Sequence, residues 1–565
     1  MRKYIILFAI TFGFISNNLA QTNHFESETI FLHTNETTFV TGETLLYKIY
    51  CLNANTNELS KISKIAYVEI IDNYGTSISR NKITLNNSTG TNEIFINTSF
   101  NTGNYKLIAY TNWMLNNSKS KYFETTISII NPFIPNKNQQ YTESKTITSE
   151  SFKDNTYSKN EDVVMNLSKY TYSKREKVEL NIVPNSQKFI DGNYSVSVRK
   201  IDDLTFNKTT NSIDFINSNP DKFINSNTIN YLPELRGELL SGKITTNDAN
   251  KTINDKHIAL SIIGEPFDFK IVKTNDKGEF HFILDKNLKK SEVILQIIEN
   301  DLNDFQIKLN DKPKLEFNDG SSKNYPIIQE KHIKDIEARL VACQIVNAYS
   351  VKDSLKTNFS NFTPFYNYNA KEYILDDYKR FPTFKETIIE IVPAVYFKEK
   401  EGNYTLHIRD YVTAGESFGN ALVLVDGLLL QDVNELFNYN TSNIYKISVV
   451  NKAYSYGSKI FSGVISITTF NREYTPKSKN ILPIQIERCT TDITFQSLNY
   501  DSEKDFTRLP DYRYQLAWDT NVTLSKDANP FRFYTSDITG KFEIRFEGFS
   551  SKGEPISIKE YFEVN

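Results

Sequence analysis

The sequence has few of the residues on which disulfide scaffolds and metal sites depend. Its 565 residues include only three cysteines, Cys51, Cys343 and Cys489, and six dispersed histidines. The cysteines are too few for a disulfide framework and too far apart for a zinc knuckle. They allow one bridge with one thiol left over, although we expect all three to be small buried hydrophobic residues. The sequence therefore predicts no metal site, and it predicts no cofactor.

Long hydrophobic runs and an excess of one charge are also absent. Beyond the first 20 residues, no apolar stretch approaches the roughly 20 residues that a membrane-spanning helix needs. The 65 basic and 68 acidic side chains give a formal net charge of −3. This balance gives no reason to expect a nucleic-acid partner.

The first 20 residues resemble a secretory signal peptide. Arg2 and Lys3 precede an apolar run over residues 4–15, and Ala20 is a small residue before Gln21. We expect cleavage before Gln21. No cysteine follows the apolar run, so we expect no lipid anchor. The mature protein is then exported, with no transmembrane span of its own.

Two short motifs imitate catalytic or metal sites but lack the required context. Ser417 lies in a Gly-x-Ser-x-Gly pattern, yet residues 421–425 after it read as a strand, and the last histidine, His407, precedes it. His33 and Glu36 match a zinc-binding spacing, but residues i and i+3 of a strand point to opposite faces. No phosphate-binding glycine loop occurs. We therefore expect no catalytic residues and a protein that is not an enzyme.

Aromatic residues are plentiful, with 33 tyrosines and 39 phenylalanines beside many isoleucines, threonines and asparagines. This composition favours strands joined by polar turns. The length suggests four or five units. We predict a mainly β fold of serial β-sandwich domains with one small α/β domain.

The small α/β domain is predicted from residues 363–472. A Val425-Asp426-Gly427 turn follows an apolar strand, and Tyr456-Gly457 leads to a strand that begins Gly463-Val464-Ile465. Upstream, an amphipathic helix from residue 384 is broken by Pro393, and residues 404–409 alternate like a strand. This arrangement resembles the plug domain of TonB-dependent outer-membrane receptors. The eight residues named in the turn and in the later strand form its structural plug motif.

A receptor plug is the stopper of a roughly 22-stranded barrel. Such a barrel needs at least about 200 residues, at about 9–11 per strand. The stretch from residue 470 to residue 565 has fewer than half as many and reads as ordinary sandwich strands. We expect a plug fold that is not followed by its own barrel.

The domain over residues 21–132 alternates with period two, as a β-sandwich does. Its Thr-Gly-Glu turn at residues 41–43, its Val-Glu-Ile-Ile-Asp strand at 68–72 and its Gly-Asn-Tyr-Lys-Leu strand at 103–107 resemble the macroglobulin-like domain of alpha-2-macroglobulins. The protease-trapping members carry a Cys-x-Glu-Gln thioester. The sequence at Cys343 is Cys-Gln-Ile-Val, which removes the reason to expect a covalent protease trap.

The other expected units follow in chain order. Residues 133–160 read as a polar linker, 161–232 as a second β-sandwich, and 473–565 as a C-terminal β-sandwich with a hairpin turn at 537–540. Residues 233–318 contain an Asn-Asp-Lys-Gly-Glu-Phe turn and resemble a carboxypeptidase-regulatory-like domain. Residues 319–362 read as a helical connector between that domain and the plug. Its helix, over 327–349, is expected to bury an apolar face of Ile333, Ile336, Leu340, Val341, Ile345 and Val346.

The whole layout resembles a family of Gram-negative outer-membrane-associated proteins with macroglobulin-like, carboxypeptidase-regulatory-like and plug domains but no receptor barrel. The first hypothesis is a structural docking subunit of an outer-membrane β-barrel complex, such as a translocon, an assembly machine or a nutrient receptor. Its partners would be an integral β-barrel protein and associated envelope subunits, at the periplasmic face or the cell surface.

Two other hypotheses stay open. One is a ligand- or glycan-binding component of nutrient uptake, in which Trp113 and Trp518 would stack on sugar rings. The other is a macroglobulin-like surface defence protein without a thioester.

Overall fold

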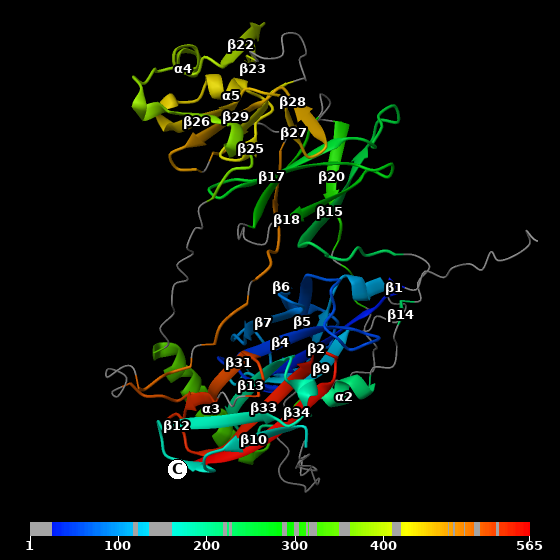
Figure 1. Ribbon diagram of the computed structural model, residues 1–565, viewed down its shortest axis with the longest axis vertical. Coiled ribbons are helices and arrows are strands. Elements are labelled where there is room, and N and C mark those ends of the chain that lie inside the picture. The colour runs from blue at the N-terminus through cyan, green and yellow to red at the C-terminus, as the bar shows by residue number, and fades with distance from the viewer. Residues whose placement is uncertain are drawn as a thin grey trace, which may run out of the picture.

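The computed structural model shows a mainly β protein arranged as two bodies along its long axis (Figure 1). The sandwich body holds the strands of residues 25–131, 163–200 and 515–564 with helices α2 and α3. The insert body holds residues 238–309 and 371–485. The structure describes residues 25–116, 122–134, 161–218, 223–224, 229–284, 291–298, 304–311, 313, 315, 325–349, 362–409, 420–472, 474–477, 481–490, 492–495, 497–501, 509–526 and 530–565.

The first sandwich packs a three-stranded sheet on a five-stranded sheet. Alternating apolar residues of both sheets meet in one core, as their period-two pattern predicts. The smaller sheet has the order β2 (Glu28–Thr34), β4 (Thr44–Asn53), β7 (Thr89–Phe95). The larger sheet has the order β3 (Thr38–Val40), β9 (Phe123–Ile130), β8 (Gly103–Tyr110), β5 (Ile65–Ile71), β6 (Ser77–Thr84).

The second sandwich is assembled from two segments more than 300 residues apart in the chain. One sheet has the order β10 (Val163–Leu167), β12 (Lys177–Pro184), β32 (Phe531–Tyr534). The other has the order β11 (Thr171–Tyr172), β34 (Pro555–Val564), β33 (Gly540–Ser550), β13 (Gly192–Lys200), β31 (Gln515–Val522).

The expectation of two separate sandwiches, over 161–232 and 473–565, is therefore wrong. Strand β13 pairs with β33 on one side and β31 on the other, so the C-terminal strands complete the sheet that the earlier segment begins. Side chains of both segments share one core. Alternation in a sequence predicts which residues a strand buries but does not predict which strand it pairs with.

The turn at residues 537–540 is not a hairpin either. Strands β32 and β33, on either side of it, belong to different sheets, so this segment crosses from one layer of the sandwich to the other. The Asp537 carboxylate accepts hydrogen bonds from Nε and Nη2 of Arg175, both at 2.6 Å. A bidentate ion pair therefore fixes the crossing.

The third β-unit, in the insert body, packs two small sheets around one core. One sheet has the order β18 (Glu279–Leu284), β15 (Glu238–Thr246), β20 (Phe305–Leu309). The other has the order β17 (Asp268–Lys273), β16 (His257–Ile262), β19 (Glu292–Ile297), β30 (Leu482–Gln485). Strand β30 comes from beyond residue 472, so this unit too is closed by a returning segment.

The fourth unit is an α/β unit with a five-stranded mixed sheet. The sheet has the order β21 (Lys371–Ile374), β26 (Ile444–Val450), β29 (Val464–Thr469), β24 (Leu422–Val425), β25 (Leu428–Leu429). Two hairpins and two helices complete the unit. The hairpins are β22 (Val395–Lys400) with β23 (Asn403–Ile408) and β27 (Tyr454–Tyr456) with β28 (Lys459–Phe461). The helices are α4 (Phe384–Ile391) and α5 (Asn434–Phe437).

Helix α4 begins at a capping box and ends before Pro393. The Thr383 hydroxyl accepts a hydrogen bond from the Glu386 backbone N–H, and the Glu386 carboxylate accepts one from the Thr383 backbone N–H. Phe384, Thr387, Ile388 and Ile391 are its buried residues, at the spacing of one helix face. The predicted helix in this segment thus exists and covers one face of the sheet.

Helix α3 (Glu330–Tyr349) buries a face that only partly matches the predicted one, since Ile336 is buried and Leu340 packs against the same core. Ile333 and Val341, predicted to be buried, are 41% and 50% exposed. The buried residues are His332, Ile336, Arg339 and Ala342. The predicted helix is present, but its apolar pattern does not identify the whole face that packs against the protein.

The helix also lies elsewhere than predicted. It packs against Val40, Ile130 and Leu204 of the sandwich body, and not between the third β-unit and the fourth unit. The guanidinium of Arg339 donates to the Asp202 carboxylate at 2.6 and 2.9 Å, and to the Thr38 carbonyl at 2.9 Å. A buried arginine with these partners fixes the packed face, because an unpaired charge could not be buried there.

The returning segment after β30 also joins the two bodies. Thr490 makes a parallel bridge to Ile83 of β6, with Thr490 N–H to Lys82 O at 2.8 Å and Thr84 N–H to Thr490 O at 3.1 Å. Glu238, at the start of β15, pairs with Lys82 at 2.9 Å. The insert body is therefore tied to the edge of the first sandwich.

The remaining elements are short. They are β1 (Phe25–Glu26) paired with β14 (Phe223–Ile224), helix α2 (Ser212–Ser218), and 3-10 turns at Trp113–Asn116, Gln187–Phe189, Asn367–Asn369, Leu375–Asp377 and Thr441–Asn443. Cys51, Cys343 and Cys489 are free thiols, so the bridge that the sequence allowed does not form. Cys51 is fully buried, and the other two are partly buried. Among the described helices, none combines the length and the hydropathy needed to cross a membrane.

Candidate functional site

The candidate site is the contact between the fourth unit and the third β-unit, because the plug motif residues gather there. Val425 and Leu428 pair across the two-residue turn that joins β24 to β25. Asp426 has φ +50° and Gly427 has φ +87°. Two consecutive positive φ angles define the type I′ hairpin turn, for which Asp-Gly is a preferred sequence.

Asp426 is a buried carboxylate that holds three segments together. It accepts hydrogen bonds from the backbone N–H of Thr469 at 2.8 Å, the hydroxyl of Thr469 at 2.6 Å and the backbone N–H of Tyr474 at 3.1 Å. Its own carbonyl accepts from the Gly264 N–H of the third β-unit at 3.0 Å. The role of Asp426 in this site is therefore structural.

Position 427 requires glycine for two reasons: its φ angle is positive, and the backbone there lies close to Phe267. A Cβ built on Gly427 would lie 2.5 Å from the Cβ of Phe267, which is far inside van der Waals contact. Gly457, at φ +58°, lies in the same way against the backbone: a Cβ there would be 2.5 Å from the Ile271 carbonyl oxygen. Both glycines let the fourth unit lie directly on the edge of β17.

Tyr456 supplies the aromatic part of the contact. Its ring stacks on Phe269 with centroids 5.6 Å apart and on Phe365 at 4.1 Å. Its hydroxyl donates to the Phe269 carbonyl oxygen. Burial raises the pKa of Tyr456 well above its ordinary value, so the hydroxyl stays protonated as a donor.

The strand that begins after Gly463 puts its side chains on both faces of the sheet. Strand β29 runs parallel to β24, with Val464 opposite Leu422 and Ile465 opposite Val423. Val464 joins the core shared with Phe269 of the third β-unit, whereas Ile465 joins the core under α4. The sheet is therefore covered on one face by the third β-unit and on the other by α4 and α5.

The structure brings the eight motif residues into one unit, in the β24–β29 part of its main sheet and in the separate β27–β28 hairpin, but sequence reasoning missed their partners. Phe267, just before β17, alternates with Phe269 and Ile271 of that strand, which was a signal for a strand with one apolar face. Nothing in that alternation shows that the face packs on another unit.

The two tryptophans considered for sugar stacking lie in the sandwich body and are buried. Trp113 donates from Nε1 to the Glu26 carbonyl at 2.8 Å, and Trp518 packs on the His33 ring with centroids 4.9 Å apart. Neither presents a ring face to solvent. The stacking role that the second hypothesis gives them has no support in this geometry.

The residues of the imitated catalytic motifs are far from any open site or lie outside the described residues. His33 is fully buried, with Nδ1 2.6 Å from the Ser195 hydroxyl, and burial lowers its pKa well below the usual range. Glu36 accepts from the Thr37 backbone N–H at 2.8 Å. Ser417 lies outside the described residues. Within the described part of the chain, no group of three or more histidine, cysteine or acidic residues is arranged to hold a metal ion.

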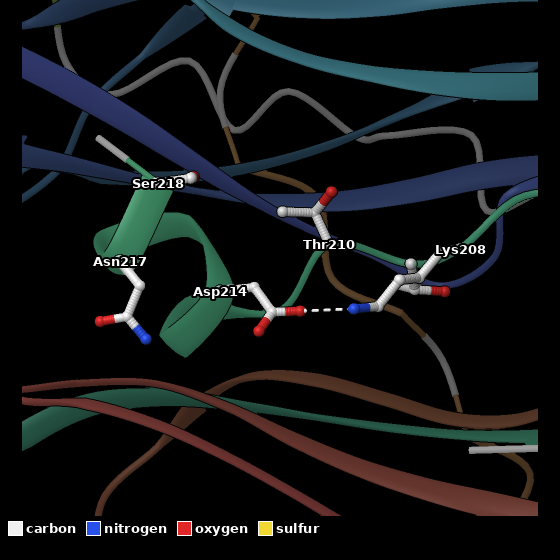
Figure 2. Close-up of a pocket in the computed structure, with 6 residues that line it drawn as sticks. Lys208, Thr210, Asp214, Asn217 and Ser218 are labelled. Carbon is white, nitrogen blue, oxygen red and sulfur yellow. Dashed lines mark hydrogen bonds and ion pairs between the residues drawn. The ribbon is translucent and has the colours of Figure 1, made fainter. Parts of the chain in front are cut away.

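A hollow beside α2 is lined by charged and polar side chains (Figure 2). Lys208 and Asp214 form an ion pair of 2.9 Å across it, and both side chains are about half exposed. Thr209, Thr210, Asn217 and Ser218 complete its lining. An exposed ion pair of this kind is worth little and does not indicate a binding site.

Comparisons with known proteins do not assign this chain to a family. No family model matches it, and no curated protein matches it. Among solved structures, Escherichia coli alpha-2-macroglobulin activated by porcine elastase aligns over 95% of this chain and 44% of its own, with 9% identity and a TM-score of 0.25. Salmonella alpha-2-macroglobulin reacted with methylamine aligns over 97% and 40%, with 8% identity and a TM-score of 0.24.

A third structure, dimeric latent PorU from Porphyromonas gingivalis, aligns over 50% of this chain and 34% of its own, with 10% identity and a TM-score of 0.16. The chain spans less than half the length of each of these proteins. At such TM-scores the similarity carries no argument about function.

Proposed function

We propose that the protein is a non-enzymatic docking subunit of an outer-membrane β-barrel complex. It is exported, has no transmembrane span of its own, and is held at the outer membrane by an integral barrel protein and associated envelope subunits. The fourth unit is the part that faces the barrel, and the sandwich body faces the other subunits.

The observation that carries the proposal is the insertion of the plug-like unit into another domain. A receptor plug is followed by the strands of its barrel. Here β30 closes the third β-unit, and β31, β33 and β34 complete the second sandwich. The described strands after the fourth unit are therefore used by earlier domains, and the barrel that the plug-like surface fits would come from another chain.

The way the insert body is built supports the same assignment. The sheet of the fourth unit is covered on both faces from within this chain, so the unit needs no barrel in order to be folded. Its hairpin β22–β23 and helix α4 lie at the end of the long axis away from the sandwich body (Figure 1). A prefolded unit carried at one end of an elongated molecule is suited to docking.

Neither alternative has a comparable observation in its favour. The glycan-binding hypothesis depended on two tryptophan rings that are buried. The defence hypothesis lacks the thioester, and Cys343 lies partly buried on α3 in contact with Gly42.

Site-specific photo-crosslinking in intact cells tests the proposal. A crosslinking residue at Ile389, which is 58% exposed on α4, should capture an integral β-barrel protein. The same residue at Tyr74, which is 89% exposed in the first sandwich, is the matched control and should not capture that barrel. Release of the protein by osmotic shock as a free monomer, with no barrel captured at Ile389, would overturn the proposal.

A further inference from the structure

The outer face of the hairpin β22–β23 carries cations along its two strands, and the acidic residue Glu401 lies in the turn at its end. Cross-strand pairing places Tyr396 opposite His407 and Lys398 opposite Thr405. Lys400, at the end of β22, and Arg409, just after β23, extend the same face, and the Arg409 guanidinium lies 5.6 Å from the centre of the Tyr396 ring. Lys398, Lys400 and Arg409 are all exposed.

The acidic residue of the same strand points the other way. Glu399 pairs with Lys385 of α4 at 3.7 Å, on the side where Phe397 and Tyr404 pack against Phe437. Alternation along the strands therefore separates the charges: carboxylate toward the helices, cations away from them. The segregation is local, because the whole chain has a net charge of −3.

We propose that this hairpin face contacts an anionic membrane surface, with Lys398, Lys400 and Arg409 bound to the phosphates of lipid headgroups and Tyr396 at the level of the headgroups. The inference rests on the proposed envelope location of the protein. It adds a direct lipid contact beside the barrel partner.

Three features of this face favour a lipid surface over a discrete ligand. The face is one side of a two-stranded ribbon with exposed cations along it, so it suits an array of phosphates. A tyrosine among lysine and arginine side chains is the composition typical of a membrane–water interface. The hairpin lies at the far end of the molecule (Figure 1), where a surface can reach it without a clash with the sandwich body.

The charge of the face sets the strength of the contact. A lysine or arginine close to an anionic leaflet contributes roughly fivefold in binding, and the effect decays over roughly 8–10 Å at moderate salt. Three such residues give roughly 100-fold, which orients a docked protein but does not anchor a free one. The barrel partner would hold the protein at the membrane, and the hairpin would set its angle.

Binding to vesicles at low ionic strength tests the inference with the full-length protein. Wild type should co-sediment with vesicles rich in phosphatidylglycerol, should not do so with phosphatidylcholine vesicles, and should be released by salt. The triple variant Lys398→Gln, Lys400→Gln, Arg409→Gln should lose roughly 100-fold in partitioning. The control variant Lys371→Gln, Lys379→Gln, Lys452→Gln removes the same charge from exposed positions of the same unit and should bind like wild type.

A local probe identifies which part of the protein touches the lipid. Tryptophan fluorescence of Tyr396→Trp should shift to the blue when anionic vesicles are added, whereas Tyr74→Trp in the first sandwich should not shift. Equal losses in both triple variants, or binding to a soluble polyanion without binding to vesicles, would overturn the inference. If vesicle binding fails while Ile389 still captures the barrel in cells, this inference falls and the docking function stands.

Discussion

The sandwich body and the insert body are held together internally by opposite kinds of contact. Where the two sandwiches and α3 meet, the buried side chains are ionisable: Arg339 lies between Asp202 and Glu43, and Lys48 reaches across from the first sandwich to the second. Where the third β-unit meets the fourth unit, aromatic rings and glycines make the close contacts, with Gly427 against Phe267, and the buried Asp426 carboxylate is bonded to backbone N–H groups and a hydroxyl.

The two contacts specify a structure in different ways. A buried ion adds little net stability, but it is costly to leave unpaired, so it selects the one arrangement in which its partners are present. A glycine under an aromatic ring selects by shape, because any side chain would separate the two backbones. We infer that polar matching fixes how the sandwiches are joined, and that close packing fixes how the fourth unit is joined to the third.

Removal of Arg339 is expected to have the largest effect on the polar contact. Arg339→Leu leaves the Asp202 carboxylate buried without its cation, while Glu43 keeps Arg199 at 2.9 Å, and this should cost about 3–5 kcal/mol. Hydrogen exchange of the α3 peptides should accelerate strongly in the variant, while the peptides of the fourth unit should be unchanged. Lys334→Leu, on the exposed side of the same helix, is the control. Unchanged exchange across α3 in Arg339→Leu would show that this contact does not depend on the ion pair.

Substitution of Gly427 tests the packed contact. Gly427→Val combines a β-branched residue at positive φ with overlap of Phe267, and it should cost about 3 kcal/mol. Gly402→Val is a close control, because Gly402 has φ +79° but no neighbouring atom within 4 Å of a built Cβ. That control should lose only about 1–2 kcal/mol. Thermal unfolding and local exchange of β24–β25 measure both, and equal losses would mean that the approach to Phe267 is unimportant.

Lys48 gives the polar contact a pH dependence that the packed contact lacks. Its amine donates to the Tyr194 carbonyl at 3.1 Å and to Asn193 and Thr520, with no carboxylate bonded to it. Burial lowers the pKa of Lys48 from 10.5 to about 7. Between these two values the unfolded chain binds a proton that the folded chain does not, so this group makes stability rise with pH in that window.

The comparison with Lys48→Met isolates that dependence. From pH 7 to pH 10, the stability of wild type relative to the variant should rise by about 1.4 kcal/mol per pH unit. Urea unfolding followed at several pH values gives the difference, and titrations of all other groups cancel in it. A difference that stays constant with pH would mean that Lys48 is charged in the folded protein.

The sequence predicts the elements of both bodies better than it predicts how they are joined. Alternation located the strands of the first sandwich, and an amphipathic pattern broken by Pro393 located helix α4, because those signals are local. The pairing of β13 with β31 and β33 could not be predicted, since more than 300 residues separate the partners. Hydrogen bonds between strands carry no signature of which strand is the partner.

Helix α3 shows the same limit for a buried face. Its isoleucines and valines suggested one packed side, but the buried side keeps Ile336 and includes Arg339 in place of Ile333 and Val341. An arginine is normally assigned to the surface. Only the positions of Asp202 and Glu43, which come from remote segments, make its burial favourable. In the candidate site, the Asp-Gly turn was recognisable from its residues, whereas Phe267 as its neighbour was not.

The smallest expected effect concerns a single hydrogen bond in the packed contact. Tyr456→Phe keeps the ring stacked on Phe269 and Phe365 but removes the hydroxyl that donates to the Phe269 carbonyl. The carbonyl is left without that donor in a partly buried place, which should cost about 1 kcal/mol.

Tyr368→Phe, at an exposed position in the segment before β21, is the control and should change stability by less than about 0.5 kcal/mol. Exchange of the β17 peptide is the readout, because β17 contains Phe269. If Tyr456→Phe loosened β17 as much as Gly427→Val does, polar matching would matter as much here as in the sandwich body, and the contrast between the two contacts would fail.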